Sequence, residues 1–412
     1  MLEKFSIHGF KSLVKVDGLK LPRLAVLFGP NAAGKSNFLD AVQALSRIGT
    51  SRTLSEALQE PIRGYAIEAF SFPAEGLPGL LSRDSADFGL KAVLGVEKDR
   101  YAYRVQVKID PHSGSITVQD EYLAVLGKTG QPKGSPLVER VEQELRIRRR
   151  GKAGNPRREP VGLPYSLLSD PRLSGLQYRG IERCRSELAR WRTYYLDPRV
   201  SMRRAAPPSD VEDVGMAGEN IAPFLYRLRA EKPKAYAAMV RTLRTLVPSV
   251  ENVDVDLDSR RGTLDIVVRE AGVNFSSRIV SEGTLRVLAL CAIVVNPWGG
   301  SLVAFEEPEN GVHPRRLELI AELLTSLVVE RKRQLIVTSH STLFCAAMLK
   351  KARDSEGDVG LFRTSRGSEG TRIEPFGAAG PLFDDGDIAA GLADRGENGV
   401  LEGLILRGML DE

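Results

Sequence analysis

Residues 29 to 36, GPNAAGKS, carry the clearest chemical pattern in the sequence. They match the spacing Gly-x-x-x-x-Gly-Lys-Ser and stand between an apolar stretch and a helical repeat of apolar residues. The two glycines allow backbone N–H groups to turn toward phosphate oxygens, the lysine reaches the outer phosphates, and the serine hydroxyl binds Mg²⁺. The predicted nucleotide and Mg²⁺ site consists of Gly29, Pro30, Asn31, Ala32, Ala33, Gly34, Lys35, Ser36 and Asn37.

Two adjacent carboxylates, Glu306 and Glu307, follow a second apolar stretch, SLVAF at 301 to 305. A buried parallel strand that ends this way presents both at the carboxyl edge of its sheet, where phosphate loops also lie. We predict that Glu306 belongs to the Mg²⁺ shell and that Glu307 is the general base or positions the attacking water. Pro308 predicts an extended Glu307. The alternative is a pair of exposed charges in a turn.

Two further stretches belong to the same set. VTSHS at 337 to 341 ends a strand with His340, and IVSEGTLRVLAL places Ser281 and Gly283 just before a helix whose N-terminus can receive a phosphate. Each has a plainer interpretation, a structural histidine in the first case and an ordinary helix N-cap in the second.

Alternating apolar strands and amphipathic helices position these residues near both ends of the chain. We expect strands at 24–28, 301–305 and 334–338, and helices at 36–48, at 284–295 and from Pro314. Each end alone has too few strands to bury both faces of a sheet, so together they predict one α/β domain with a mostly parallel sheet.

The middle of the chain has a different pattern. Period-two alternation at 101–109, followed by GSITVQ and EYLAVL, predicts an antiparallel meander, and helices are expected at 180–196 and 220–247, the second interrupted by Pro233. We therefore divide the chain into a discontinuous core, 1–50 and 276–412, and an inserted β-meander and helical lobe, 51–275.

The order of these motifs resembles that of the ABC-type ATPase heads of the SMC, RecF and OLD-like AAA group. The opening FSIHGFKSL is similar to the first strand of that group, and GPNAAGKSN, VSEGTLR, FEEPENGVHP and VTSHS follow in its order. The resemblance implies a P-loop fold that binds ATP and Mg²⁺ and forms a homodimer through an ATP sandwich, with a higher oligomer left open. It also implies a role for each of the motif residues in binding or hydrolysing ATP.

The roles are carried over residue by residue. Lys35 and Ser36 hold phosphates and Mg²⁺, Glu306 is the metal-side acid, Glu307 is the catalytic glutamate, and His340 senses the γ-phosphate. Ser281 and Gly283 contact the ATP of the other subunit, and Asn310 to His313 form the loop that crosses the dimer. The chain departs from the group in having Glu306 where many relatives have Asp, in its degenerate SEGTLR, and in lacking a recognisable glutamine-loop residue.

The metal-dependent Toprim nuclease domain of OLD-type members is not expected here, because about 70 residues follow His340. Asp385 and Asp387, in the acidic run FDDGD, are interpreted as a loop, and GVLEGLILRGML at 399–410 is expected to form a terminal helix. A nuclease or other effector is expected on a separate polypeptide.

Composition restricts the protein class. The chain has 412 residues, 42% of them hydrophobic, and no apolar run approaches the roughly 18 to 20 residues of a membrane span. We therefore expect a globular, cytoplasmic protein without a membrane partner. Cys184, Cys291 and Cys345 are far apart and suggest neither a zinc site nor disulfides.

These patterns favour an ATP-hydrolysing, dimerising switch that acts with DNA or a separate effector nuclease, in DNA repair or antiphage defence. Two alternatives stay open: a nucleotide-bound scaffold with negligible turnover, and an ABC transporter motor.

A basic segment at 139–159, ERVEQELRIRRRGKAGNPRRE, is a candidate DNA contact, and a solvated loop is the alternative. If it contacts phosphates, replacing Arg148, Arg149 and Arg150 with alanine weakens DNA binding and flattens its salt dependence. Unchanged affinity across a salt titration contradicts this prediction.

Overall fold

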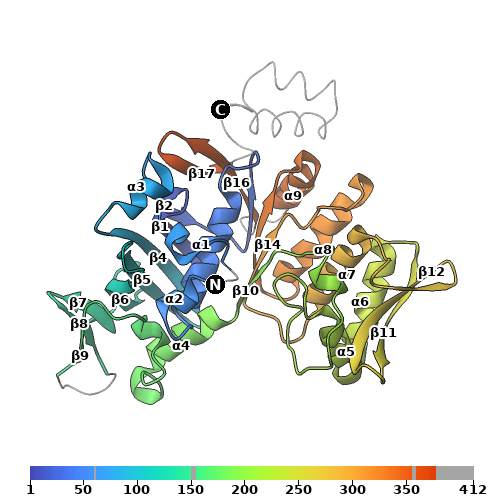
Figure 1. The fold of residues 1–412 in the computed structure, drawn as a ribbon, viewed down its shortest axis with the longest axis horizontal. Coiled ribbons are helices and arrows are strands. Elements are labelled where there is room, and N and C mark those ends of the chain that lie inside the picture. The colour runs from blue at the N-terminus through green and yellow to red at the C-terminus, as the bar shows by residue number, and fades with distance from the viewer. Residues whose placement is uncertain (60–61, 150–154, 355–358, 377–412) are drawn as a thin grey trace.

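A computed structural model of the chain describes residues 1–59, 62–149, 155–354 and 359–376 (Figure 1). Three sequence predictions fall outside these ranges. They concern Arg150 in the basic segment, the acidic run at 383–387 with Asp385 and Asp387, and a helix expected at 399–410.

A six-stranded sheet forms the centre of the fold. Its strands, in spatial order, are β10 (Trp191–Tyr194), β14 (Leu302–Glu306), β15 (Gln334–Ser339), β3 (Leu24–Phe28), β16 (Val359–Gly367) and β17 (Gly370–Phe376). The first five run parallel, and β17 is antiparallel to β16. Every residue of β3 and β15 is buried, as expected for parallel strands covered on both faces. The predicted α/β fold with a mostly parallel sheet is confirmed.

Strand β10 corrects the sequence prediction of one helix over 180–196. Helix α4 (Arg179–Ala189) ends before it, and Trp191 to Tyr194 then pair in parallel with β14. Aromatic and β-branched residues favour a strand where a neighbouring sheet edge offers hydrogen bonds. The range 51–275, assigned to the inserted lobe, thus contributes one strand to the central sheet.

A second, antiparallel sheet of eight strands lies beside the central one. Its strands, in spatial order, are β2 (Leu13–Lys20), β1 (Leu2–Phe10), β4 (Ala86–Val96), β5 (Asp99–Ile109), β6 (Ile116–Leu126), β7 (Val138–Val141), β8 (Glu144–Ile147) and β9 (Arg157–Pro160). The predicted meander is present. From Ile116 onward, GSITVQ and EYLAVL form a single strand, β6, and the register of its pairing with β5 shifts between Gln106 and Val107.

The chain also contains further helices, short 3₁₀ helices and a third sheet. The helices are α1 (Lys35–Ile48), α2 (Leu54–Ala57), α3 (Gly76–Leu81), α5 (Ile221–Glu231), α6 (Pro233–Leu246), α7 (Glu282–Val295), α8 (Leu317–Val329) and α9 (Thr342–Asp354). Short 3₁₀ helices are η1 (Ala66–Ala69), η2 (Leu167–Ser169), η3 (Leu176–Tyr178), η4 (Ser201–Arg203) and η5 (Pro314–Arg316). A third sheet contains β11 (Val250–Asp258), β12 (Thr263–Glu270) and β13 (Val273–Ser276).

Several helix predictions are confirmed in their type and approximate bounds. Pro233 separates α5 from α6 and is the first residue of α6, where its missing N–H costs no hydrogen bond. The helix expected from Pro314 begins instead as the 3₁₀ turn η5 and continues as α8. The residues on its apolar face are buried, among them Leu317, Ile320, Leu324 and Leu327.

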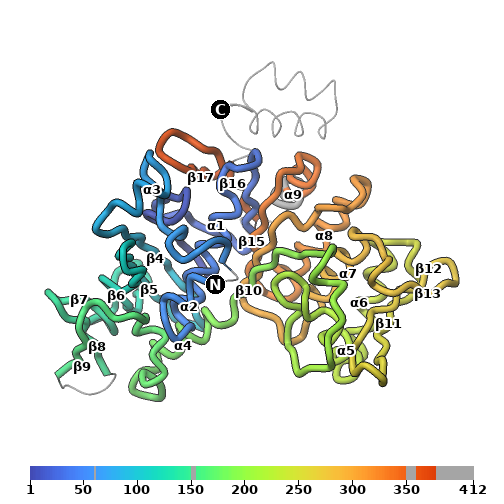
Figure 2. The backbone as a smooth tube through the Cα atoms, in the orientation of Figure 1, coloured from blue at the N-terminus to red at the C-terminus, as the bar shows by residue number. Residues whose placement is uncertain are grey.

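Strand β3 separates two hydrophobic cores. Ala25 and Leu27 pack in the core that α1 shares with the antiparallel sheet, while Leu24, Val26 and Phe28 pack in the core that contains α7, α8 and α9. The two groups of elements lie on opposite sides of the central strands (Figures 1 and 2). Burial of each large apolar side chain contributes roughly 1.5–3 kcal/mol, so β3 is held firmly on both faces.

Cys184, Cys291 and Cys345 are free and buried. Over the described ranges, the structure contains no helix that is both long enough and apolar enough to cross a membrane.

Candidate active site

The segment 29–36, here called the P-loop, joins the end of β3 to the start of α1. Gly34 precedes the helix with a φ of 100°, a left-handed conformation that glycine adopts without a side-chain clash. Among the described residues, no side chain caps this helix. The first N–H groups of an α-helix have no intrahelical partners, so here they are left for a ligand at the positive end of the helix dipole.

Close packing explains both glycines of the P-loop. A Cβ atom at Gly29 would lie 2.1 Å from the carbonyl oxygen of Thr364, and one at Gly34 would lie 2.1 Å from Oγ1 of Thr371. Thr371 also donates a hydrogen bond of 2.9 Å to the carbonyl of Ala33. The β16–β17 hairpin thus packs against the P-loop, a contact that the motif alone does not reveal.

Lys35 is held inside the P-loop. Its Nζ donates to the carbonyl oxygens of Gly29 (2.9 Å) and Pro30 (2.8 Å), and its side chain is 5% exposed. Burial lowers the pKa of Lys35, while the nearby Glu307 and Glu306 act in the opposite direction. The ammonium group lies where it can exchange these carbonyls for phosphate oxygens.

The predicted Mg²⁺ ligands Ser36 and Glu306 lie in direct contact, with the Ser36 hydroxyl donating to Oε1 of Glu306. A hydroxyl and a carboxylate are hard oxygen ligands that suit Mg²⁺. Mg²⁺ bound with a nucleotide needs few protein ligands, because phosphates and water fill its other positions. The residues present therefore fit the ion that the resemblance implies.

Glu307 is not extended, in contrast to the expectation from Pro308. Its φ is 46°, a sparsely populated region for a non-glycine residue. The backbone N–H of Glu307 donates to the carbonyl of Thr338 (3.0 Å) on β15, and the N–H of Asn310 donates to the carbonyl of Glu307 (3.1 Å). Sheet pairing on one side and the turn on the other together determine this conformation.

Two side chains hold the Glu307 carboxylate. Nδ2 of Asn310 donates to Oε2 (2.6 Å), and Nδ1 of His340 lies 2.7 Å from Oε1, within hydrogen-bond distance. Glu307 and His340, predicted from separate stretches, are thus in contact. Because His340 follows β15 directly, it reaches the carboxylate from the neighbouring strand.

Ser281 and Gly283 lie at the N-terminus of α7 and not in this cluster. The Ser281 hydroxyl accepts a hydrogen bond from the N–H of Thr284 (3.1 Å), so it is the N-cap of the helix. A Cβ atom at Gly283 would lie 2.2 Å from the carbonyl oxygen of Gly311. The α7 N-terminus therefore packs against the loop that follows Glu307.

Glu309 is a third carboxylate that sequence reasoning missed. Its side chain is 5% exposed, the Ser339 hydroxyl donates to Oε1, and Oε2 has no hydrogen-bond partner among the described residues. Burial raises the pKa of Glu309 to about 7, and the charge of Glu307 adds to this shift. The sequence shows a carboxylate two residues after Glu307, but the burial of Glu309 depends on the turn that begins at Glu307.

Arg63 and Asp40 were also missed. Asp40, fully buried on α1, accepts from Lys11 (2.6 Å), Arg63 (3.0 Å) and Tyr195 (2.8 Å), and Arg63 also lies 3.4 Å from Glu306. These five residues come from separate parts of the chain, so no local pattern links them.

A cleft of about 1090 Å³ adjoins the P-loop on the side of Lys11 and Arg63. Lys11, Ser12, Asn37, Arg63 and Thr371 are among the residues that line it.

Two arginines of the basic segment are engaged within the chain. Arg148 forms an ion pair of 2.5 Å with Glu139 and donates to the carbonyl of Pro136, and Nε of Arg149 donates to the hydroxyl of Tyr178 (3.2 Å). These contacts give both residues a structural role. The proposal that they bind DNA stays a prediction.

Comparisons with known proteins agree with the fold. A family model described as "AAA domain, putative AbiEii toxin, Type IV TA system" matches residues 24–346. A solved SMC head bound to the C-winged helix domain of ScpA is similar over 92% of this chain and 98% of that chain, with 14% identity and a TM-score of 0.53. The chain thus has the fold of an SMC-type ATPase head.

Two further solved structures are similar to the chain with lower TM-scores. The SMC head domain from Thermotoga maritima has 15% identity and a TM-score of 0.44, over 92% of this chain and 99% of that chain. The recombination mediator RecF has 12% identity and a TM-score of 0.42, over 92% and 98%. No curated protein matches the chain.

Gly283→Ala tests the contact between α7 and the Gly311 loop. Because the new Cβ atom would overlap the Gly311 carbonyl, we expect a loss of about 1–3 kcal/mol in the free energy of unfolding. Urea unfolding followed by circular dichroism measures it. Gly89→Ala is the matched control, since a Cβ atom there meets no atom within 4 Å. Equal stability of the two variants contradicts the prediction.

Glu309→Gln tests the buried carboxyl through pH. The pKa of Glu309 is raised from 4.5 to about 7, so the native state keeps a proton that the unfolded chain releases. The wild type therefore loses stability relative to the glutamine variant as pH rises from 4.5 to 7, by about 3 kcal/mol. Above pH 7 the difference stays constant.

Urea unfolding of the nucleotide-free protein across this pH range measures the difference. Glu330→Gln, at an exposed residue, should follow the wild type. Parallel curves for the wild type and Glu309→Gln would show that Glu309 titrates normally.

Proposed function

The chain belongs to the family of AAA domains whose description names the putative AbiEii toxin of type IV toxin–antitoxin systems, and we propose that it binds ATP with Mg²⁺ and hydrolyses it. One observation carries the proposal: Lys35, the Ser36–Glu306 pair and the Glu307–His340 pair meet at one edge of the central sheet. A phosphate loop alone supports binding, whereas hydrolysis also needs a metal-side acid and a group that activates water.

Binding uses the P-loop and the adjoining cleft. The N–H groups at the start of α1 and the Nζ of Lys35 hold the phosphate oxygens, and the nucleoside lies in the cleft lined by Lys11, Asn37 and Arg63. Ser36 and Glu306 hold Mg²⁺, which when bound neutralises charge on the β- and γ-phosphates. Arg63 adds a positive charge next to Glu306.

Glu307 accepts the proton of the attacking water. A general base must lie within hydrogen-bond distance of the proton it removes and must have a defined orientation. Asn310 and His340 supply that orientation through Oε2 and Oε1. His340, which is exposed, is the residue proposed to sense the γ-phosphate.

The proposal includes a homodimer that ATP closes. Ser281 is exposed at the positive end of α7, so a second copy can present it to the γ-phosphate across an interface. The contact between Gly283 and the Gly311 carbonyl joins this helix end to the loop that begins at Glu307. Closure at α7 therefore acts on the residues that hold the catalytic glutamate, and a γ-phosphate that favours the closed state makes a two-state switch.

The biological role is proposed as a class of process and a class of partner. The family description names a putative toxin of type IV toxin–antitoxin systems, and we propose a role in antiphage defence or in DNA repair. We propose that the switch acts on DNA or on a separate effector protein.

Glu307→Gln is expected to lower ATP turnover at least 100-fold and to leave ATP binding intact, because the amide keeps the size of the side chain but accepts no proton. Lys35→Ala is expected to lose ATP binding itself, since it removes the ammonium group from the P-loop. Phosphate release gives turnover, and equilibrium dialysis with labelled ATP gives binding.

Glu330→Gln, an exposed carboxylate change, should retain wild-type turnover. If the wild type binds ATP but shows no turnover, alone or with DNA, the protein is a nucleotide-bound scaffold and the hydrolysis proposal is wrong. If Glu307→Gln turns over ATP at the wild-type rate, Glu307 is not the base.

A further inference from the structure

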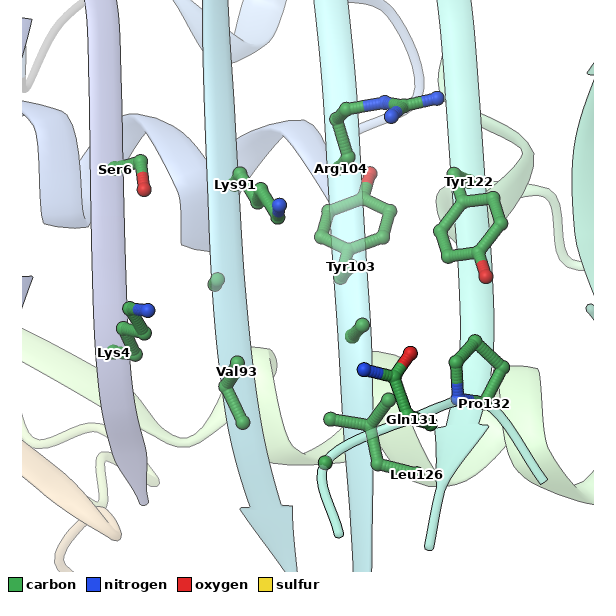
Figure 3. Close-up of a pocket in the computed structure, with 13 residues that line it drawn as sticks. Lys4, Ser6, Lys91, Val93, Tyr103, Arg104, Tyr122, Leu126, Gln131 and Pro132 are labelled. Atoms are coloured by element: carbon green, nitrogen blue, oxygen red, sulfur yellow. The ribbon is translucent and has the colours of Figure 1, made fainter. Parts of the chain in front are cut away.

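The antiparallel sheet carries a hollow of about 560 Å³ on its outer face, here called the outer hollow (Figure 3). The side chains that give it chemical character come from β1, β4, β5, β6 and the loop after β6. They are Lys4, Ser6, Lys91, Arg104, Tyr122 and Gln131. This surface belongs to a different sheet from the one that holds the P-loop.

Short side chains and a folded-back loop form the outer hollow. Val93 and Ala102 are opposite each other in the register and make a low floor. After β6 the chain returns, pairs Pro132 with Leu126, and places Gln131 along one side (Figure 3). The shape is therefore a consequence of the strand pairing and of small residues at two positions.

Positively charged residues cross this face from strand to strand. Lys20 of β2 is opposite Lys4 of β1, and Ser6 of β1, Lys91 of β4 and Arg104 of β5 are successive partners in the register. Among the described residues, no carboxylate forms an ion pair with Lys4, Lys20 or Lys91. Neighbouring strands are about 4.8 Å apart, so the three lysines from β2 to β4 span about 10 Å.

A flat polar surface lies at the end of this row. The guanidinium of Arg104 lies 5.3 Å from the centre of the Tyr122 ring, and Asp120 holds it with an ion pair of 2.7 Å. The ion pair neutralises much of the Arg104 charge and fixes its plane. Guanidinium planes and aromatic rings are the surfaces on which unpaired bases stack.

We propose that the outer hollow binds single-stranded nucleic acid. The phosphates follow Lys20, Lys4 and Lys91, and one unpaired base enters the hollow against Arg104 and Tyr122. This inference goes beyond ATP hydrolysis and does not depend on it, because no residue of the P-loop takes part.

The spacing of the lysines and the shape of the outer hollow favour a single strand over a free nucleotide or a duplex. The phosphate-binding lysines spread over about 10 Å, which exceeds the reach of one phosphate group, so a chain of phosphates fits better than a nucleotide with a single phosphate. A duplex keeps its bases paired, so none of them can enter the hollow. A basic row beside a stacking surface is the arrangement used for single strands with little sequence preference.

The test measures binding of a fluorescein-labelled 12-nucleotide poly(dT) strand to the full chain by anisotropy, without ATP, over a range of salt concentrations. The double variant Lys4→Gln, Lys91→Gln is expected to bind about tenfold more weakly at 0.1 M salt, and its salt slope should fall by about 1.4, since each lost phosphate contact on a single strand removes about 0.7. Tyr122→Leu is expected to weaken binding about tenfold with an unchanged slope.

The matched control replaces two exposed lysines elsewhere, Lys98→Gln and Lys234→Gln, and should keep wild-type affinity and slope. The proposal is overturned if the wild type does not bind the strand, if the control weakens binding as much as the double variant, or if a 12-base-pair duplex binds as tightly as the single strand. Turnover of ATP without nucleic acid should be unchanged in every variant, so failure here leaves the ATPase proposal standing.

Discussion

Parallel pairing of β3, β15 and β14 is the constraint on which the whole site depends. Phe28 is opposite Ser339, and Glu306 is opposite Thr338, so the three strands end at nearly the same level. Glu306 is the last residue of β14, and the P-loop, Glu307 and His340 follow the three strand ends directly, so these groups meet because the strands do. A slip of one residue in this register would turn alternate side chains to the opposite face and bury the wrong ones. The two cores on either side of β3 stabilise the register far from the chemistry.

The site concentrates negative charge in a short segment and balances it from elsewhere in the fold. Glu306 contacts Ser36 and lies near Arg63, Glu307 is held by Asn310 and His340, and Glu309 is buried beside Ser339. The positive φ of Glu307 and the raised pKa of Glu309 are both costs to stability that a structural turn would avoid. Such local costs are typical of residues arranged for a reaction and not for stability alone.

Sequence patterns predicted the elements that depend on nearby residues. The P-loop, β14, β15, α7 and the division at Pro233 were all recognisable, because period, apolar runs and glycine spacing are local signals. Strand β10 was mistaken for helix, since its four residues become a strand only by pairing with β14. The conformation of Glu307 was mistaken because sheet pairing with Thr338 overrides the usual preference before proline. Asp40 contacts Lys11, Arg63 and Tyr195, and Tyr195 lies 155 positions after Asp40 in the sequence. A local sequence pattern therefore cannot link these four residues.

The amino-acid sequence by itself determined the kinds of chemical group available and the order in which they follow their strands. A phosphate loop after one strand, two carboxylates after another and a histidine after a third are facts of sequence. Only the tertiary structure decided that Ser36 contacts Glu306, that His340 contacts Glu307, and that Gly283 packs on Gly311. Likewise, only strand pairing set Lys4, Lys91 and Arg104 around one hollow. The physical reason is that side-chain proximity across a sheet depends on strand order and register, which non-local backbone hydrogen bonds and burial determine together.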